Sequence, residues 1–398
     1  MRKNSGCLRE IFSVMMAVAL ALMPVLSPLS QRVALAAPLE DALPFAAEAP
    51  SVMLLEVESG RVIAEKNADE KRPAASIVKE MSLLLIFEAL GDGRLALDDD
   101  VTVSRTAAGI GGSQALLDAG SAYPAEALIR SIIVASANDA TLALAEHLYG
   151  SETAFAERMN QKAQAMGLEN SVFINATGLP AEGQHTTARD IAVMSRALLS
   201  IPEYTRWSTI WTTQITHKNG RVTDLVNTNR LIRFYEGADG VKTGSTDEAK
   251  NCIAASAQRG GLHLLAIVLG AEKSKERFDI ASRLLDYGFD HYLMVELFKQ
   301  GDLIEAAVPV RGGRENRVDL VAGENVRLMV RKGDEKRITA DGVVPEVLHA
   351  PLDGTPIAQL AVFLGDVQVA TVDVVPAHAI GRPGLLGAVA RVLERWVR

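Results

Sequence analysis

The pattern of hydrophobic and polar residues first separates a long region of mixed helices and strands from a shorter region of strands. In the long region, apolar residues 52–55 and 62–64 flank Ser59-Gly60-Arg61, which predicts a β-hairpin. Strand-like runs also occur near Gly240 and over residues 262–269. Apolar positions recur at helical spacing over residues 81–90, 125–148, 151–166, 190–199 and 275–287. Helices and strands intermixed in this way indicate an α/β (α+β) domain in which helices cover a sheet.

The pattern changes at about residue 297, where short runs rich in β-branched residues begin. These runs cover residues 308–310, 318–321, 326–330, 360–363 and 367–375. Turn residues such as Lys332-Gly333-Asp334 and Asp353-Gly354 separate them. We therefore expect a small all-β domain over residues 297–378, after a larger domain over residues 38–292.

The N-terminal residues have the pattern of a secretory signal peptide. Arg2, Lys3 and Arg9 precede an apolar run over residues 11–26, and the small residues 34–36 follow it. A transmembrane anchor is the alternative, but a run of about 16 residues is short for a span that needs roughly 20. The sequence predicts a signal peptide over residues 1–36 and therefore an exported protein.

The C-terminal residues predict an amphipathic helix over residues 381–398. Its apolar residues recur every three or four positions: Leu385, Leu386, Val389, Val392, Leu393, Trp396 and Val397. The segment from Arg382 onward carries four arginines and one glutamate, a charge of +3. A packed terminal helix would show a similar stripe, but the basic polar face favours attachment to the outer face of the cell membrane.

Composition limits the partners and the chemistry. Hydrophobic residues make up 48% of the 398 residues, enough for a sizeable core, and the formal net charge of -8 makes nucleic acid an unsuitable partner. Removing residues 1–36 takes away four basic residues and one acidic one, so the mature charge is -11. Cys7 leaves with that segment, and Cys252 then has no partner for an intrachain disulfide.

No metal or other cofactor is predicted from the sequence. Metal-binding histidines usually recur at short, fixed spacings. The seven histidines are scattered instead: His147, His185, His217, His263, His291, His349 and His378. No glycine-rich phosphate loop precedes a helix either.

Three short motifs carry the candidate chemistry. In Ser76-Ile77-Val78-Lys79, helical spacing places Lys79 on the same face as Ser76 and one turn further on. A serine hydroxyl needs a base to become a nucleophile, and lysine can serve once burial and nearby cations lower its pKa. The motif is common by chance, and alone it would describe a capping serine and a surface lysine.

The second and third motifs supply further polar groups. Ser136-Ala137-Asn138 falls between two apolar helical stretches, where Ser136 could pass a proton and Asn138 could hold Lys79 and a substrate amide. Lys242-Thr243-Gly244 follows a strand-like run. On an edge strand, Lys242 and Thr243 could bind a carboxylate, and Gly244 could let a substrate backbone approach closely. Each motif alone is also compatible with an ordinary polar loop or turn.

In this order and spacing, the three motifs resemble the signature of the serine penicillin-recognising enzymes. The chain is most similar to the low-molecular-mass penicillin-binding proteins, the serine-type D-Ala-D-Ala carboxypeptidases of peptidase family S11. Further similarity spans about residues 50–292. It includes Pro73-Ala74-Ala75, Asn138-Asp139-Ala140, Met159-Asn160 and residues 173–179, 187–190 and 284–289. The resemblance implies a penicillin-binding-protein-like transpeptidase fold, followed in this family's membrane-associated members by a β domain and an amphipathic tail.

The resemblance also implies roles for the motif residues. Ser76 would attack the carbonyl between the two terminal D-alanines of a peptidoglycan stem peptide, with Lys79 as its base and Ser136 with Lys242 as the proton relay. Lys242 and Thr243 would hold the terminal carboxylate. The backbone N–H groups of Ser76 and Ser245 would form the oxyanion hole. β-Lactam antibiotics would acylate Ser76 and leave slowly.

Two positions depart from the pattern of some members. Ser245 stands where some have histidine, and Gly270-Ala271-Glu272-Lys273 stands where some have an arginine. Arg277 follows shortly afterwards, so the sequence leaves open which cation besides Lys242 completes the carboxylate site.

Two other functions are alternatives to a carboxypeptidase. A class A β-lactamase shares the first and third motifs but deacylates with a glutamate on a loop, for which Glu157 is the candidate. Because Glu157 falls within the predicted helix of residues 151–166, a structural role is favoured. A peptidoglycan- or membrane-binding scaffold with an inactive site is the other alternative, and the complete set of motifs argues against it.

Overall fold

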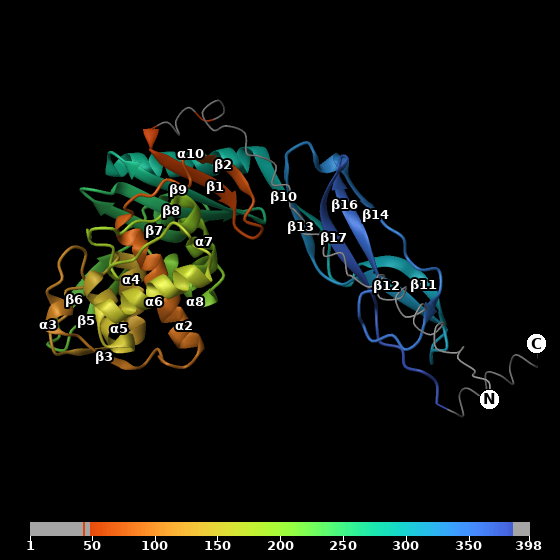
Figure 1. The fold of residues 1–398 in the computed structure, drawn as a ribbon, viewed down its shortest axis with the longest axis horizontal. Coiled ribbons are helices and arrows are strands. Elements are labelled where there is room, and N and C mark those ends of the chain that lie inside the picture. The colour runs from red at the N-terminus through yellow and green to blue at the C-terminus, as the bar shows by residue number, and fades with distance from the viewer. Residues whose placement is uncertain (1–42, 44–47, 385–398) are drawn as a thin grey trace, which may run out of the picture. The chain divides into compact units, whose positions relative to one another are not determined.

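A five-stranded antiparallel sheet forms the centre of the first part of the chain (Figure 1). The computed structural model describes residue 43 and residues 48–384. The strand order is β2-β1-β9-β8-β7, so β7 is an edge strand. The role suggested for Lys242-Thr243-Gly244 in binding substrate needs such a position. The strands are β1 (Ser51–Glu56), β2 (Val62–Lys66), β7 (Ala238–Thr246), β8 (Lys250–Arg259) and β9 (Leu262–Ala271).

Helices cover both faces of this sheet. Helix α10 (Ser274–His291) packs on one face, against β8 and β9, while α7 (Ala188–Leu199) packs on the other (Figure 1). Side chains of β1 alternate between the two layers: Val52 and Leu54 belong to the core under α10, and Met53 and Leu55 to the core on the helical side. Burial on both faces explains the continuous apolar run in β1.

The helical layer is built around α2 (Lys79–Gly91), whose residues from Lys79 to Phe87 are all buried. A helix surrounded on all sides needs apolar residues on all sides, which its buried stretch supplies apart from Lys79, Glu80 and Ser82. Helix α2 packs against α7, α5 (Asn138–Tyr149) and α6 (Glu152–Ala165). The other helices of this layer are α4 (Ala125–Ala135) and α8 (Pro202–Ser208). Shorter elements are η2 (Ala75–Val78), α3 (Arg105–Ala108), α9 (Leu231–Phe234), and the strand pairs β3 (Asp100–Thr102) with β4 (Ala122–Pro124) and β5 (Thr212–Thr216) with β6 (Val222–Val226).

The second part of the described chain is all-β, as predicted. A six-stranded sheet has the order β14-β16-β17-β12-β11-β15, and β10 pairs with β13. The strands are β10 (Tyr292–Phe298), β11 (Leu303–Arg311), β12 (Arg317–Ala322), β13 (Val326–Arg331), β14 (Ile338–Asp341), β15 (Leu348–His349), β16 (Ala358–Leu364) and β17 (Val367–Pro376), with a 3-10 turn η3 (Glu335–Arg337). Its core is a cluster around Val308, Leu320 and Val374.

The predicted elements are largely present, with two differences. The apolar stretch of residues 125–148 forms two helices, α4 and α5, which are separated at Ser136-Ala137. The sequence did not predict several strands and short helices: β3, β4, β5, β6, β8, β10, β14 and β15, and α3, α8 and α9. The predicted signal peptide of residues 1–36 and the apolar residues of the predicted tail helix lie outside the described residues. Among the residues that are described, no helix has the length and apolar character needed to span a membrane.

Candidate active site

Ser76 and Lys79 lie together where η2 leads into α2. The sequence predicts a serine that opens an α-helix, but Ser76 instead belongs to the 3-10 turn η2, and Lys79 is the first residue of α2. In a 3-10 turn, residues three apart are eclipsed, which brings the two side chains together. Lys79 Nζ donates hydrogen bonds to Ser76 Oγ at 2.9 Å and to the carbonyl oxygen of Thr177 at 2.6 Å.

The surroundings of Lys79 destabilise its protonated, positively charged form. Its side chain is fully buried, and burial lowers the pKa of Lys79 well below its ordinary value. The positive charge of Lys242 lowers this pKa further, while the carboxylate of Asp139 opposes the shift. A lysine that loses its proton this easily can accept the proton of the neighbouring serine.

Ser136 and Lys242 form a second pair on the other side of the site. Ser136 ends α4 in the left-handed conformation (φ 60°), and its Oγ accepts a hydrogen bond from Lys242 Nζ at 2.7 Å. Burial lowers the pKa of Lys242 to about 7, with the Glu80 carboxylate opposing the shift and the Arg277 guanidinium adding to it. Lys242 is therefore close to its midpoint at neutral pH.

The rest of the third motif anchors strand β7 to its surroundings. Thr243 Oγ1 donates to Thr228 Oγ1 at 2.8 Å. A Cβ on Gly244 would lie 2.5 Å from the carbonyl oxygen of Ala74 and 3.0 Å from the backbone nitrogen of Ser76. The sequence predicts that Gly244 lets a substrate backbone approach closely, and the structure shows in addition that Gly244 makes room for the segment that carries Ser76.

The side chain of Asn138 makes a different contact from the one expected. Its Nδ2 donates to the carbonyl oxygen of Gly111 at 2.9 Å rather than holding Lys79. Its Oδ1 is buried with no hydrogen-bond partner in the described chain. Since a buried unpaired oxygen is costly, this atom is a natural acceptor for a substrate N–H.

Several residues that support the site were not predicted. The carboxylate of Asp139 accepts hydrogen bonds from the backbone nitrogens of Ala115 and Leu117, which fixes the loop next to Asn138. Glu80 is fully buried beside Lys79; its Oε2 accepts from Ser195 Oγ at 2.7 Å, and its Oε1 has no partner within the described chain. Glu80 could have been recognised from the sequence, because it is a charged residue at the start of a strongly apolar helical stretch.

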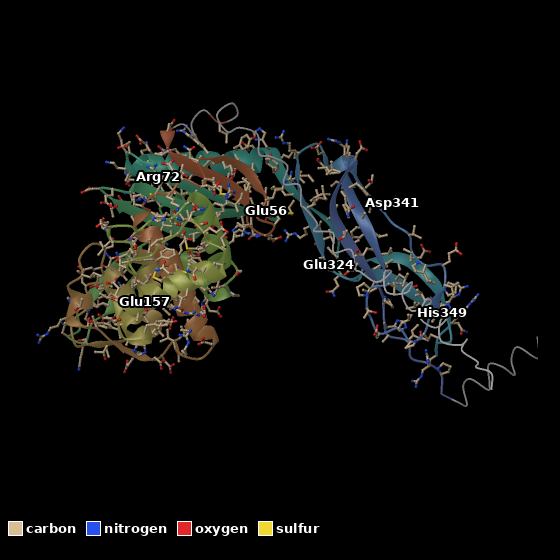
Figure 2. All side chains as sticks on the ribbon, viewed as in Figure 1. Glu56, Arg72, Glu157, Glu324, Asp341 and His349 are labelled. Carbon is tan, nitrogen blue, oxygen red and sulfur yellow. The ribbon has the colours of Figure 1, made fainter. Side chains whose placement is uncertain are left out.

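The structure also gives the positions of Arg277, a candidate for the carboxylate site, and Glu157, the candidate for a deacylating glutamate. Arg277 is buried, and its Nη1 donates to the carbonyl oxygen of Gly244 at 2.8 Å. Glu157 is exposed on α6 (Figure 2), in the helix where the sequence placed it. An exposed helical position agrees with the structural role preferred for Glu157 over a deacylating one.

Comparison with known proteins decides the family. The model of the D-alanyl-D-alanine carboxypeptidases, Peptidase S11, matches residues 37–273, and the model of the penicillin-binding protein 5 C-terminal domain matches residues 292–382. The chain belongs to the D-alanyl-D-alanine carboxypeptidase family. The predicted enzyme class, a serine-type D-Ala-D-Ala carboxypeptidase, is thereby confirmed. The predicted fold, an α/β domain of the penicillin-binding type followed by a small all-β domain, is confirmed as well.

Relatives of this carboxypeptidase cover nearly the whole described chain. It is 35% identical to D-alanyl-D-alanine carboxypeptidase DacF of Bacillus subtilis over 353 residues, which cover 88% of this chain and 90% of DacF. It is 34% identical to DacA of Escherichia coli over 77% of this chain and 76% of DacA. The crystal structure of penicillin-binding protein 5 from Haemophilus influenzae superposes with a TM-score of 0.70 at 28% identity, covering 84% of this chain and 98% of that one.

Proposed function

We propose that Ser76 is the nucleophile of this carboxypeptidase and that Lys79 is its base. The observation that carries the proposal is the 2.9 Å contact between Lys79 Nζ and Ser76 Oγ, made by a lysine whose pKa is lowered by burial. In its neutral form Lys79 accepts the proton of Ser76 while Oγ attacks the carbonyl carbon between two D-alanine residues. The peptide C–N bond then breaks and leaves an acyl ester on Ser76.

The proton for the departing amine comes through the second pair. Ser136 Oγ lies 2.7 Å from Lys242 Nζ, so it can pass a proton to the leaving D-alanine while Lys242 replaces that proton. A Lys242 pKa of about 7 suits this role, because giving up and regaining a proton then costs little near neutral pH. Water afterwards hydrolyses the ester and releases the shortened stem peptide.

The remaining site residues bind the substrate. Lys242 and Thr243 hold the terminal carboxylate, next to Gly244, and the unpaired Oδ1 of Asn138 accepts a substrate N–H. The backbone N–H groups of Ser76 and Ser245 stabilise the oxyanion, at about 3 kcal/mol per donor. β-Lactam antibiotics enter the same site and form a slowly hydrolysed ester with Ser76. The names of the penicillin-binding relatives support this inhibition.

The carboxypeptidase is expected to act outside the cell, at the outer face of the cytoplasmic membrane. Residues 1–36 have the pattern of a signal peptide, and the basic, amphipathic pattern of residues 381–398 suits peripheral attachment. Stem peptides of the peptidoglycan lie on that side of the membrane, where the enzyme would trim their terminal D-alanine.

One experiment separates carboxypeptidase from β-lactamase activity. The purified protein is incubated with a stem pentapeptide ending in D-Ala-D-Ala and, separately, with benzylpenicillin, and both mixtures are followed by mass spectrometry. Loss of one alanine from the pentapeptide, together with a long-lived penicillin adduct, is the expected result. Rapid turnover of penicillin with an intact pentapeptide would show that the site works as a β-lactamase.

A further inference from the structure

Glu80 is a buried acid beside the proposed catalytic residues, and the mechanism described above gives it no role. It follows Lys79 in the first turn of α2, and its side chain is fully buried. A buried carboxylate is stable only with hydrogen-bond donors or a cation around it. Among the described residues, the donor to Glu80 is Ser195 Oγ on α7, at 2.7 Å from Oε2, while Oε1 is buried without a partner. This geometry favours a neutral, protonated Glu80 until a cation forms next to it.

The cation that acts on Glu80 is Lys242. Helix α2 packs against α7, and both α7 and α8 pack against β7, the strand that carries Lys242. Burial lowers the pKa of Lys242 to about 7, and the Glu80 carboxylate opposes this shift. Burial raises the pKa of Glu80 to about 8, opposed by the hydrogen bond from Ser195 and by the charge of Lys242.

Tyr204 on α8 belongs to the same buried cluster. Its hydroxyl donates to the carbonyl oxygen of Val241, next to Lys242, at 2.8 Å. Burial raises the pKa of Tyr204 well above its ordinary value, and the charge of Glu80 raises it further, so this hydroxyl stays protonated. Glu80 and Lys242 are therefore the two groups of the cluster whose charges change near neutral pH, and each charge depends on the other.

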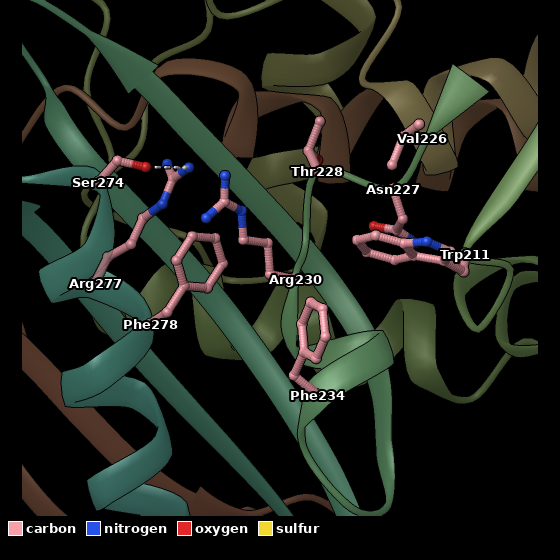
Figure 3. A pocket seen from close by; sticks show the side chains of 9 residues that line it. All are labelled: Trp211, Val226, Asn227, Thr228, Arg230, Phe234, Ser274, Arg277 and Phe278. Carbon is pink, nitrogen blue, oxygen red and sulfur yellow. Dashed lines mark hydrogen bonds between the residues drawn. The ribbon is translucent and has the colours of Figure 1, made fainter. Parts of the chain in front are cut away.

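The other charges that act on Lys242 are positive. Burial and then the charge of Lys242 lower the pKa of Lys79, so the two lysines repel each other when both are protonated. Arg277 lowers the pKa of Lys242 as well, and its guanidinium lies beside that of Arg230 (Figure 3). In the part of the chain that the structure describes, no aspartate or glutamate makes an ion pair with either arginine. Glu80 is thus the acid that can offset a positive charge on Lys242.

Several other charged groups on the elements around Glu80 have partners of their own. On β7, Asp239 accepts from Ser256 Oγ at 2.6 Å and pairs with His263 at 3.0 Å. On α5, α6 and α7 the pairs are Asp139 with the backbone nitrogens of Ala115 and Leu117, Arg158 and Lys162 with Glu88, Arg189 with Asp69, Asp190 with Ser171, and Arg196 with the carbonyl oxygen of Val57. Asp139 in addition opposes the lowered pKa of Lys79. The charge of Glu80 is left to act on Lys242.

We propose that Glu80 is a positioning residue for Lys242, and that it becomes a carboxylate when Lys242 becomes the ammonium that holds the substrate's terminal carboxylate. Glu80 loses one proton and Lys242 gains one, so an acid and an amine turn into a carboxylate and an ammonium. The net charge of the buried pair is zero before and after this exchange. The site therefore gains a cation for the substrate without adding net charge to the interior. The proposal rests on the proposed function, because it assumes that Lys242 holds this carboxylate.

The exchange serves both roles that Lys242 has in the proposed mechanism. As an ammonium, Lys242 attracts the carboxylate and replaces the proton that Ser136 passes to the leaving amine. The proton that Ser76 gave to Lys79 restores the charge of Lys242. When the D-alanine leaves with its carboxylate, Glu80 takes back a proton and Lys242 returns to its earlier state, so the exchange consumes no proton over a full turnover.

The test compares Glu80→Gln with the unmodified enzyme from pH 5.5 to pH 8.5, with a stem pentapeptide ending in D-Ala-D-Ala as substrate. Glutamine has nearly the same shape as glutamic acid but cannot ionise. At pH 5.5 Glu80 is neutral and Lys242 is protonated, so the two proteins should have similar kcat/KM. Above pH 7 only the unmodified enzyme can offset the charge of Lys242. Because an opposite charge nearby changes a protonation equilibrium by about tenfold or more, kcat/KM should fall by about tenfold in the variant at pH 8, mainly through KM.

Infrared difference spectroscopy detects the proton on Glu80 itself. A protonated carboxyl group has a C=O stretching band that a carboxylate lacks. The unmodified enzyme at pH 7 should lose such a band when benzylpenicillin, which also carries a carboxylate, acylates it. Isotope labelling of glutamate assigns the band, and Glu80→Gln should show no loss. The measurement on the unmodified enzyme tests the exchange even if the variant does not fold.

Glu157→Gln, which removes an exposed acid from α6, is the control and should match the unmodified enzyme at every pH. A loss of activity in Glu80→Gln that is the same at every pH would indicate a purely structural role and overturn the inference. A glutamate carboxyl band that penicillin leaves unchanged would overturn it as well. Either result leaves the D-Ala-D-Ala activity standing. An unmodified enzyme that releases no D-alanine at any pH would overturn the proposed function and this inference with it.

Discussion

The carbonyl oxygen of Ala74 lies only 2.5 Å from the point where a Cβ would stand on Gly244. Strand β7 and the turn η2 therefore touch through a position that tolerates no side chain, and the same contact sets the distance between the third motif and Ser76. The proposed catalytic groups come from segments far apart in the sequence, and backbone packing of this kind fixes their relative positions.

Gly244→Ala should accordingly reduce both stability and acylation. The added methyl must push β7 away from η2, and overpacking of this kind costs about 1–3 kcal/mol. Gly91→Ala is the control, because a Cβ at Gly91 meets no atom within 4 Å, and it should be neutral or stabilise by up to about 1 kcal/mol. Chemical denaturation and penicillin acylation rates measure the two effects. A Gly244→Ala protein with unchanged stability and acylation would show that the close contact does not matter.

Lys79 should control how acylation depends on pH. Only its neutral form accepts a proton, so the acylation rate should rise as Lys79 deprotonates, with a midpoint well below the ordinary lysine value of 10.5. Lys79→Arg keeps the charge at all pH values, so it should remove this rise and slow acylation by about 10²–10⁴-fold. Stopped-flow measurements with a fluorescent penicillin provide the rates. Lys162→Arg on α6 is the control, and a rise that persists in Lys79→Arg would exclude Lys79 as the base.

Glu80 should make folding stability fall as pH rises. Burial raises the pKa of its carboxyl from an ordinary 4.5 to about 8, so between these values the folded protein holds a proton that the unfolded chain releases. Each pH unit in this window then costs up to about 1.4 kcal/mol of stability. Glu80→Gln cannot ionise, so its stability relative to the unmodified protein should improve steadily from pH 5 to pH 8. Urea unfolding at several pH values measures this difference, and the exposed Glu157→Gln serves as control. A constant difference across this range would contradict a neutral Glu80.

The sequence predicts the residues of the candidate site better than the groups that hold them in place. The three motifs identify Ser76, Lys79 and Lys242 because each requires a particular side chain at a fixed spacing. The acceptor on Thr177 is a backbone carbonyl, and any residue type could provide it. The contact between Gly244 and the segment of Ser76 was not predicted either, because the sequence shows that space is needed at Gly244 but not which group occupies it.

The strands of the central sheet also differ in how well the sequence predicts them. Strand β1 was predicted because its residues are strongly apolar and a turn follows them. Strand β8 was missed although it is almost fully buried, because Ala254, Ala255 and Ala257 have little intrinsic preference for strands. The position of β8 depends on pairing with β7 and β9, which are contacts of the folded chain.

Deletion of residues 381–398 should release the protein from membranes. The arginines and apolar residues of this segment would bind anionic lipid, and each basic residue near such a surface contributes about 1 kcal/mol. Sedimentation with anionic vesicles should pellet the mature full-length protein but not the truncated one, and penicillin labelling of both proteins provides the control for folding. Equal sedimentation of the two proteins would show that the attachment lies elsewhere or does not exist.

The central claim, that Ser76 forms the acyl-enzyme, is tested most directly by the intact mass of the protein after exposure to benzylpenicillin. The unmodified enzyme should gain the mass of one penicillin, Ser76→Ala should gain none, and Ser131→Ala, which removes a buried hydroxyl within α4, should still gain one. An adduct on Ser76→Ala of the same mass and yield as on the unmodified enzyme would show that another residue is the nucleophile.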